Sequence, residues 1–279
     1  MYQQQSLLLI LTVLTAPCSH AWVTAPPPRA TSALNFFWKT WEEKATTTTV
    51  VMSDEERVQK VQQYERDIDE ALERGDESVL PSLFQQLEAL NVPLEPNRSP
   101  DFFGDWSVWY TDCPPPSNGQ LGPFQGTSGQ VIFDDEAKTY QNLLKVPPND
   151  WLTATLDGVW EEWDGTLLTI ENYQTEGYAS ITNPPKNIDW GANHWKVTFV
   201  QLTIRLLGIT LVQKEFPPNT SRVWRTTYMD EEIRIVRAGK TGRVEDEVVF
   251  FTKRSPAPLL AKSSNPGLEW LTKCFQPKE

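Results

Sequence analysis

The feature that most constrains the fold is a series of short runs with period-two alternation between Asp101 and Arg254. Glycine, proline and asparagine separate the runs, and no helical period interrupts them. The cleanest alternation covers 196–206, where both faces carry apolar side chains. We therefore predict a mainly β protein, with one antiparallel sheet closed into a barrel around a cavity. The runs cover 105–111, 129–133, 138–145, 152–160, 166–172, 176–182, 194–206, 209–215, 222–228, 232–237 and 247–253.

Residues 53–92, ahead of the barrel, have a helical pattern instead. Ser53 and Glu56 match the capping box that opens helices, and apolar residues then recur at helical spacing until Gly75 interrupts them. We predict two short helices joined near Gly75. Two arrangements are open: the helices close one end of the barrel as a lid, or they pack outside it and cover apolar surface.

The N-terminus has the pattern of a two-part targeting sequence. The apolar core from Ser6 to Leu14 is far shorter than the roughly 20 residues of a membrane span, so it indicates a secretory signal, with cleavage after Ala21. Residues 22–52 are rich in hydroxyl groups and poor in acids, which is typical of a transit peptide. A signal peptide (1–21) followed by a transit peptide (22–52) resembles the presequences of algae with secondary red plastids, such as diatoms. Plain secretion is the alternative.

The charge of the chain limits its partners. A formal net charge of −12 argues against a nucleic-acid ligand, because nucleic-acid binding depends on basic side chains. It also predicts long-range repulsion from anionic lipid surfaces, so association with a membrane or lipid droplet would be hydrophobic or to neutral galactolipid. Cys113 and Cys274 remain after loss of the signal peptide, and we expect two free thiols.

The residue inventory argues against an enzyme. Of two histidines, only His194 lies outside the predicted signal peptide, and no nucleophile-elbow, phosphate-loop or zinc pattern occurs. The adjacent carboxylates Asp134-Asp135 and Glu161-Glu162 could serve as acid and base, but neighbours on a strand face opposite ways, so we expect solvated turn charges. We predict no catalytic residue, no metal and no cofactor.

Tryptophan is unusually frequent, with 12 residues in the chain. Indole rings could line a cavity for a prenyl chain, a carotenoid or a sugar face, or they could simply pack the barrel. Those inside the predicted barrel are Trp106, Trp109, Trp151, Trp160, Trp163, Trp190, Trp195 and Trp224.

The segment 225–240 places two strand-like runs around the acidic corner Met229-Asp230-Glu231. Alternation puts Trp224, Thr226 and Tyr228 on one face of the first run. In the second run it puts Ile233 and Ile235 opposite Arg234 and Val236.

A hairpin here brings Arg225, Asp230 and Arg234 within reach of one another. If buried, the two guanidiniums would pair with the carboxylate and brace the strand ends. Alternatively, Asp230 and an arginine would orient the polar head of a ligand at the cavity rim, beside the Tyr228 hydroxyl.

Two segments together resemble the plastid lipid-associated proteins, also called plastoglobulins or plastid fibrillins. Gly104, Trp106, Tyr110 and Thr111 match the strand that opens the barrel in that family, and the residues from Arg225 to Ile235 match its closing motif. The resemblance covers roughly residues 55–254. The segment from Gly239 to Glu247 is longer and more charged than in the family, and residues 112–200 do not align with it.

The resemblance implies a lipocalin-like barrel at 100–254 without catalytic activity. It implies a protein that binds or shelters isoprenoid, carotenoid or acyl lipids, such as a prenylquinone, at thylakoids or plastoglobules in the plastid. The residues it marks as ligand-binding or barrel-closing are Trp106, Tyr110, Arg225, Tyr228, Asp230 and Arg234.

Two other functions are open. One is a structural protein that coats lipid droplets or organises photosynthetic complexes, with a filled core. The other is a secreted carbohydrate-binding β protein, for which the glycosylation patterns at Asn97 and Asn219 would be usable. The tail 255–279 ends in an apolar stretch that either docks across the barrel mouth or anchors the protein to a lipid surface.

Overall fold

The computed structural model describes residues 52–90, 95–166, 169–170, 173–174, 188–218, 220–239 and 247–259. The chain divides into two compact units, residues 1–60 and 61–279, and the barrel belongs to the second. The targeting segments 1–21 and 22–52 lie almost entirely outside the described residues, as does the apolar end of the tail. No helix in the described part of the chain is both long and apolar enough to cross a bilayer.

Two helices precede the barrel, as predicted: α3 (Asp54–Arg74) and α4 (Leu80–Glu88). The capping box is formed, because the Ser53 N–H donates to the Glu56 carboxylate and the Glu56 N–H donates to the Ser53 hydroxyl, each at 3.2 Å. Helix α3 ends where Gly75 takes a φ of +68°, a left-handed conformation that favours glycine.

The predicted barrel is confirmed. Its eight described strands are hydrogen-bonded in the order β9-β11-β12-β13-β1-β4-β5-β6, and β6 pairs again with β9 to close the ring. Every neighbouring pair is antiparallel. The strands are β1 (Gly104–Thr111), β4 (Thr127–Ile132), β5 (Thr139–Val146), β6 (Leu152–Glu162), β9 (His194–Leu206), β11 (Ser221–Met229), β12 (Ile233–Gly239) and β13 (Glu247–Arg254).

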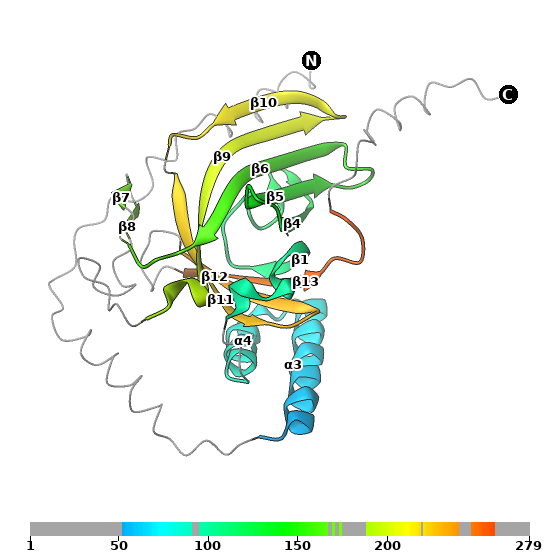
Figure 1. Ribbon diagram of the computed structural model, residues 1–279. Helices are drawn as coiled ribbons and strands as arrows, with labels where there is room; N and C mark the ends of the chain where they lie inside the picture. Colours follow the sequence, from blue (N-terminus) through cyan, green and yellow to red (C-terminus); the bar gives the residue numbers. More distant parts are fainter. Residues whose placement is uncertain are drawn as a thin grey trace, which may run out of the picture. The chain divides into compact units, whose positions relative to one another are not determined.

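Strand β9 is shared between two partners along one edge. Its first residues pair with β11, and its last residues pair with β10 (Ile209–Glu215), while β6 follows nearly all of its other edge. Figure 1 shows β10 running along β9 outside the ring. The hydrophobic side chains of Ile209 and Leu211 are 63% and 51% exposed there. Strand β10 thus extends the sheet and is not one of the strands that close the barrel.

Other predicted runs differ from the structure. In the run 166–172, the described residues include the short strand β7 (Thr169–Ile170), which pairs with β8 (Tyr173–Gln174), and 176–182 lies outside the described residues. A small hairpin of β2 (Gln120–Leu121) and β3 (Phe124–Gln125) was not predicted from the alternation, because each strand has only two residues.

An aromatic core fills one part of the barrel interior. The ring centroid of Trp195 lies 4.9 Å from that of Trp224 and 5.2 Å from that of Phe102. The Tyr140 ring contacts the indoles of Trp195 and Trp224. Four of the tryptophans therefore pack the interior, as the simpler interpretation expected. The buried members are Phe102, Trp106, Ile132, Tyr140, Trp160, Trp195, Val197, Trp224, Met229, Val236, Ala238, Val248 and Phe250.

The helices pack on the outer face of the sheet, so the lid arrangement is wrong. Phe84 of α4 stacks on Phe251 of β13, with 5.4 Å between the ring centroids. Its ring centroid lies 5.6 Å from that of Tyr110 in β1. Ile68 of α3 is fully buried in the same cluster as Ile235 of β12. Strands β12, β13 and β1 turn apolar side chains both inward and outward, and only a covering layer can bury the outward set.

Candidate functional site

The expected cluster of Arg225, Asp230 and Arg234 does not form. The register pairs Arg225 with Arg237, while Arg234 pairs with Met229, and a bulge separates Thr226 from Tyr228 in β11. The bulge turns Tyr228 to the outer face, with Ile233 and Ile235, and leaves Arg234 on the inner face with Val236. The prediction that Trp224, Thr226 and Tyr228 share one face is therefore wrong, since an extra residue reverses the alternation.

Asp230 holds the turn between β11 and β12 instead of pairing with an arginine. Its carboxylate accepts hydrogen bonds from the Tyr228 hydroxyl at 2.7 Å and from the N–H groups of Glu232 and Ile233 at 2.9 and 2.8 Å. An aspartate that binds backbone donors two and three residues ahead fixes a tight turn.

Arg225 and Tyr110 also lie away from the interior. The Arg225 guanidinium donates to the Glu247 carboxylate at 2.8 Å. Tyr110 packs against the helix cluster, where burial raises the pKa of its hydroxyl, with smaller contributions from Asp112 and Glu77. Of the six residues predicted for ligand binding or barrel closure, only Trp106 and Arg234 face the inside of the barrel.

Trp106 is fully buried and carries two cations on its ring. The guanidinium carbons of Arg234 and Arg254 lie 4.6 and 3.9 Å from the ring centroid, the geometry of cation–π contacts. The guanidinium of Arg254 has three backbone acceptors, the carbonyls of Phe103, Asp101 and Glu231. Gly104 permits this, since a Cβ there would lie 3.0 Å from the Arg254 side chain.

Arg234 is 0% exposed, and its guanidinium donates one described hydrogen bond, to the side-chain carbonyl of Gln130 at 2.5 Å. No described carboxylate lies within ion-pair distance of it. Burial lowers the pKa of Arg234 to about 9, an effect that Tyr140 opposes and the positive charge of Arg254 reinforces. The group therefore stays a cation at neutral pH, and its burial is costly without an anion.

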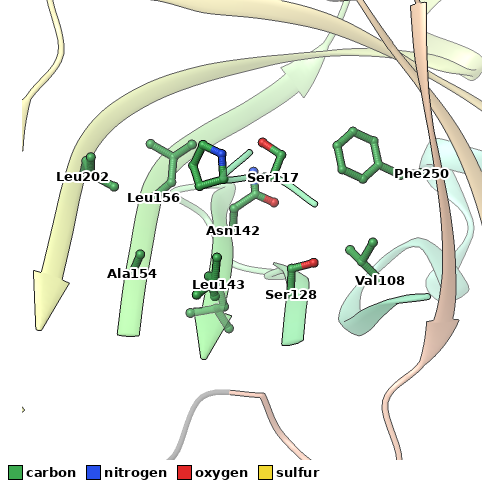
Figure 2. A pocket seen from close by; sticks show the side chains of 12 residues that line it. Val108, Ser117, Ser128, Asn142, Leu143, Ala154, Leu156, Leu202 and Phe250 are labelled. Atoms are coloured by element: carbon green, nitrogen blue, oxygen red, sulfur yellow. The ribbon is translucent and has the colours of Figure 1, made fainter. Parts of the chain in front are cut away.

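A half-open pocket lies inside the barrel. Its volume is about 90 Å³, smaller than the 300–1,000 Å³ typical of pockets that take a whole drug-sized molecule. Figure 2 shows Leu202, Leu156 and Ala154 along one side and Val108 and Phe250 along the other, with polar Asn142 and Ser128 between them. The loop residues Pro116 and Ser117 complete the lining near the end of β1.

The interior holds two hydrogen-bonded polar pairs, Arg234 with Gln130 and Tyr140 with Asn142. Tyr140 donates its hydroxyl to the Asn142 side-chain carbonyl at 2.6 Å, and burial raises the Tyr140 pKa well above its ordinary value, so the proton stays on the hydroxyl. Gln130 and Asn142 were not among the residues predicted from the sequence. Both lie at inward positions of predicted strands, next to Ile132 and Tyr140, and a polar side chain at such a position was the available signal.

The remaining candidates for chemistry have structural roles. Asp135 accepts the Thr139 N–H at 2.8 Å and closes a turn, Glu161 pairs with Lys196, and Glu162 pairs with Arg98 at 2.6 Å. Burial, with a smaller effect of Arg225, lowers the pKa of His194 to about 3, so this imidazole is neutral at physiological pH. No group of three or more metal-ligating side chains gathers within the described ranges.

Comparison of the chain with models of known protein families gives no match, and comparison with curated protein sequences gives none either.

Proposed function

We propose that this protein is a non-catalytic lipid-binding protein of the plastid, related to the plastid fibrillins. It holds the chain of an isoprenoid, carotenoid or acyl lipid inside its barrel and works at thylakoids or plastoglobules. The observation that carries the proposal is the pocket inside the barrel. Its lining is mainly apolar, and its polar side chains are Ser117, Ser128 and Asn142.

The shape of the pocket favours a lipid chain over a compact polar ligand. Leu144, Leu156 and Leu202 come from three adjacent strands and present hydrocarbon to the same space. A volume of about 90 Å³ suits one extended chain segment better than a carotenoid ring or a whole sugar. Burial of apolar surface, at about 25 cal/mol per Å², would supply most of the affinity.

The experiment is lipid exchange followed by mass spectrometry. The full chain is incubated with vesicles that contain a galactolipid, a fatty acid, a prenylquinone and a carotenoid, then re-purified and extracted. We expect one lipid class to remain bound at about one molecule per protein. The variant Ala154→Phe fills the pocket and should lose most of it, because a phenyl ring occupies the space of the chain.

Val159→Phe provides the matched control on the same strand. Val159 is 40% exposed, so its substitution leaves the pocket untouched and should retain lipid as the wild type does. Recovery of no lipid from the wild type, or equal recovery from Ala154→Phe, would refute the proposal.

A lipid-droplet coat is the second candidate, favoured by the exposed apolar side chains of Val200, Ile209 and Leu211 on β9 and β10. A coat protein would bind triacylglycerol emulsions whether or not the pocket is filled. Emulsion flotation of Ala154→Phe separates the candidates: a coat protein floats like the wild type, while a carrier that needs its pocket does not.

The plastid assignment has its own test, which uses only residues 1–52. A fusion of this segment to a fluorescent reporter, expressed in a diatom, should give plastid fluorescence, because a signal peptide followed by a transit peptide directs import in two steps. Export of the reporter to the medium would favour the secreted alternative.

Glycosylation at Asn97 is blocked in the folded protein, since its side chain is 1% exposed and bonded to Gly191 and Thr226.

A further inference from the structure

The barrel interior holds buried hydrogen-bond donors that have no acceptor among the described residues. Five such nitrogen atoms belong to inward-facing side chains, and each of them is a donor. They are Nε and Nη1 of Arg234, Nε2 of Gln130, and Nε1 of Trp160 and Trp195. Buried polar atoms are nearly always paired in folded proteins, so a set of donors alone points to a ligand that brings acceptors.

The orientation of Gln130 is fixed by its neighbour. Its side-chain oxygen accepts from Arg234, and the opposite orientation would set an NH₂ group against a guanidinium. The Nε2 donor must therefore point elsewhere in the interior. Arg234 and Gln130 together present three buried donor atoms, and one of these residues carries a positive charge.

Strand neighbours of Gln130 and Arg234 line the apolar pocket. Gln130 pairs directly with Asn142, and Ser128 lies two residues along the same inward face of β4; both Asn142 and Ser128 line the pocket (Figure 2). From the other side, Thr252 pairs with Arg234 and also with Val108, which lines the opposite wall. A chain in the pocket would thus have its end at the donor pair.

We propose that the barrel selects a long-chain carboxylate, with the carboxylate on Arg234 and Gln130 and the hydrocarbon chain in the pocket. The inference rests on the proposed lipid-binding function and names the head group that this function prefers. A carboxylate accepts several hydrogen bonds and neutralises one cation. A quinone carbonyl or an alcohol offers acceptors but no charge, and a phosphate monoester brings more negative charge than this single unpaired arginine carries.

Equilibrium dialysis of the full chain with radiolabelled myristate and with radiolabelled myristyl alcohol tests this directly. The two probes share one chain and differ in the head. We expect the wild type to bind myristate about tenfold or more tightly than the alcohol, as charge-assisted hydrogen bonds in a dry site require. Arg234→Met should remove most of this preference, because myristate loses a charge-assisted hydrogen bond while the alcohol loses at most a neutral acceptor contact.

Arg205→Met is the matched control, because Arg205 lies on β9 at a position that alternates with the inward Ile204. It should keep the preference for myristate. Gln130→Leu provides a second interior variant, and we expect it to weaken the binding of myristate more than the binding of the alcohol. Thermal melting of each variant without lipid verifies that it is folded.

The outcomes separate this inference from the proposed function. Equal binding of both probes by the wild type, or an undiminished preference in both Arg234→Met and Gln130→Leu, would overturn the carboxylate assignment and leave lipid binding in place. Binding of neither probe, together with no lipid recovered after exchange, would overturn the proposed function itself.

Discussion

At the scale of single residues, the acidic turn shows how a motif can be recognised while its role is misjudged. The sequence suggested that Asp230 pairs with two arginines, since Arg225 and Arg234 flank it at hairpin spacing. The structure gives its carboxylate three local donors instead, two of them backbone N–H groups. A turn residue of this kind stabilises its own loop and has no part in neutralising the buried arginine.

The stability of Asp230 variants distinguishes these roles. Asp230→Ala should lower the free energy of unfolding by about 2 kcal/mol, the size expected for losing a few modest hydrogen bonds. Loss of a buried ion-pair partner would cost about 3–5 kcal/mol. Urea denaturation measures the difference, with the exposed neighbour Glu231→Ala as a control near zero. A loss above about 3 kcal/mol would contradict the turn assignment.

His194 makes a second prediction, for the dependence of stability on pH. Its folded pKa of about 3 lies below the ordinary value of 6.5, so the unfolded chain takes up a proton first as the pH falls. The contribution of neutral His194 to the free energy of unfolding is therefore intact above pH 6.5 and is lost as the pH falls toward 3. Between pH 8 and pH 5 the wild type should lose about 2 kcal/mol more than His194→Gln, measured by urea denaturation at each pH. Parallel pH profiles would show that the imidazole is not held neutral.

Among single residues, the sequence could place Arg234 but not its partner. Alternation puts Arg234 on the face of Val236, and the structure agrees. Gln130 lies 104 positions earlier, and only the closed ring of strands brings the two side chains together. Period-two patterns therefore predict which way a residue points, while the identity of its contacts depends on strand order.

At the scale of elements, alternation predicted where the long strands lie but not where they bulge. The ends of the run 194–206 were predicted correctly, but the register between β6 and β9 shifts at Val200, so the inward residues change from Trp195 and Val197 to Leu202. In β11 the extra residue between Thr226 and Tyr228 moves Tyr228 to the outer face, and nothing in the local pattern marks it. Likewise, helical spacing predicted α3 and α4 but not the face they cover, since that depends on which strands expose apolar residues outward.

The attachment of α4 to the sheet yields the next prediction. Glu88 at the end of α4 accepts two hydrogen bonds from the Arg237 guanidinium, at 2.8 and 3.0 Å, and one from Thr227 at 2.6 Å. Both charged side chains are largely shielded from water, at 17% and 23% exposure. Glu88→Ala should therefore lower the free energy of unfolding by about 2 kcal/mol.

Glu70→Ala is the comparison for this pair. Glu70 faces Arg74 one turn along α3 at 3.7 Å, with both side chains more than half exposed, and such pairs contribute about 0–0.5 kcal/mol. Chemical denaturation of the two variants should separate them by more than about 1 kcal/mol. Equal losses would mean that the Glu88 network is as solvated as the surface pair.

At the scale of the whole molecule, the barrel combines a packed half with a half that can admit a chain. Aromatic rings fill the interior around Trp195 and Trp224, and the outward apolar faces of β12 and β13 are covered by helices. The pocket lies toward β5, β6 and the last residues of β9, where β10 adds no buried side chain. The proposed binding pocket and the packed core thus occupy different parts of one sheet.

This division predicts uneven protection of backbone amides from hydrogen exchange. Strand β10 pairs only with β9 in the described structure and has no buried side chain, whereas β12 pairs on both edges and is buried on both faces. Local opening costs least where few apolar contacts are lost, so amides of 209–215 should exchange at least about a hundredfold faster than those of 233–239. Exchange followed by mass spectrometry measures this. Added myristate should slow exchange in the pocket strands β5, β6 and β9, and also in β12, because β12 opens only with the whole barrel and a bound ligand stabilises the native state as a whole. Unchanged exchange in β5, β6 and β9 would show that myristate does not bind in the pocket.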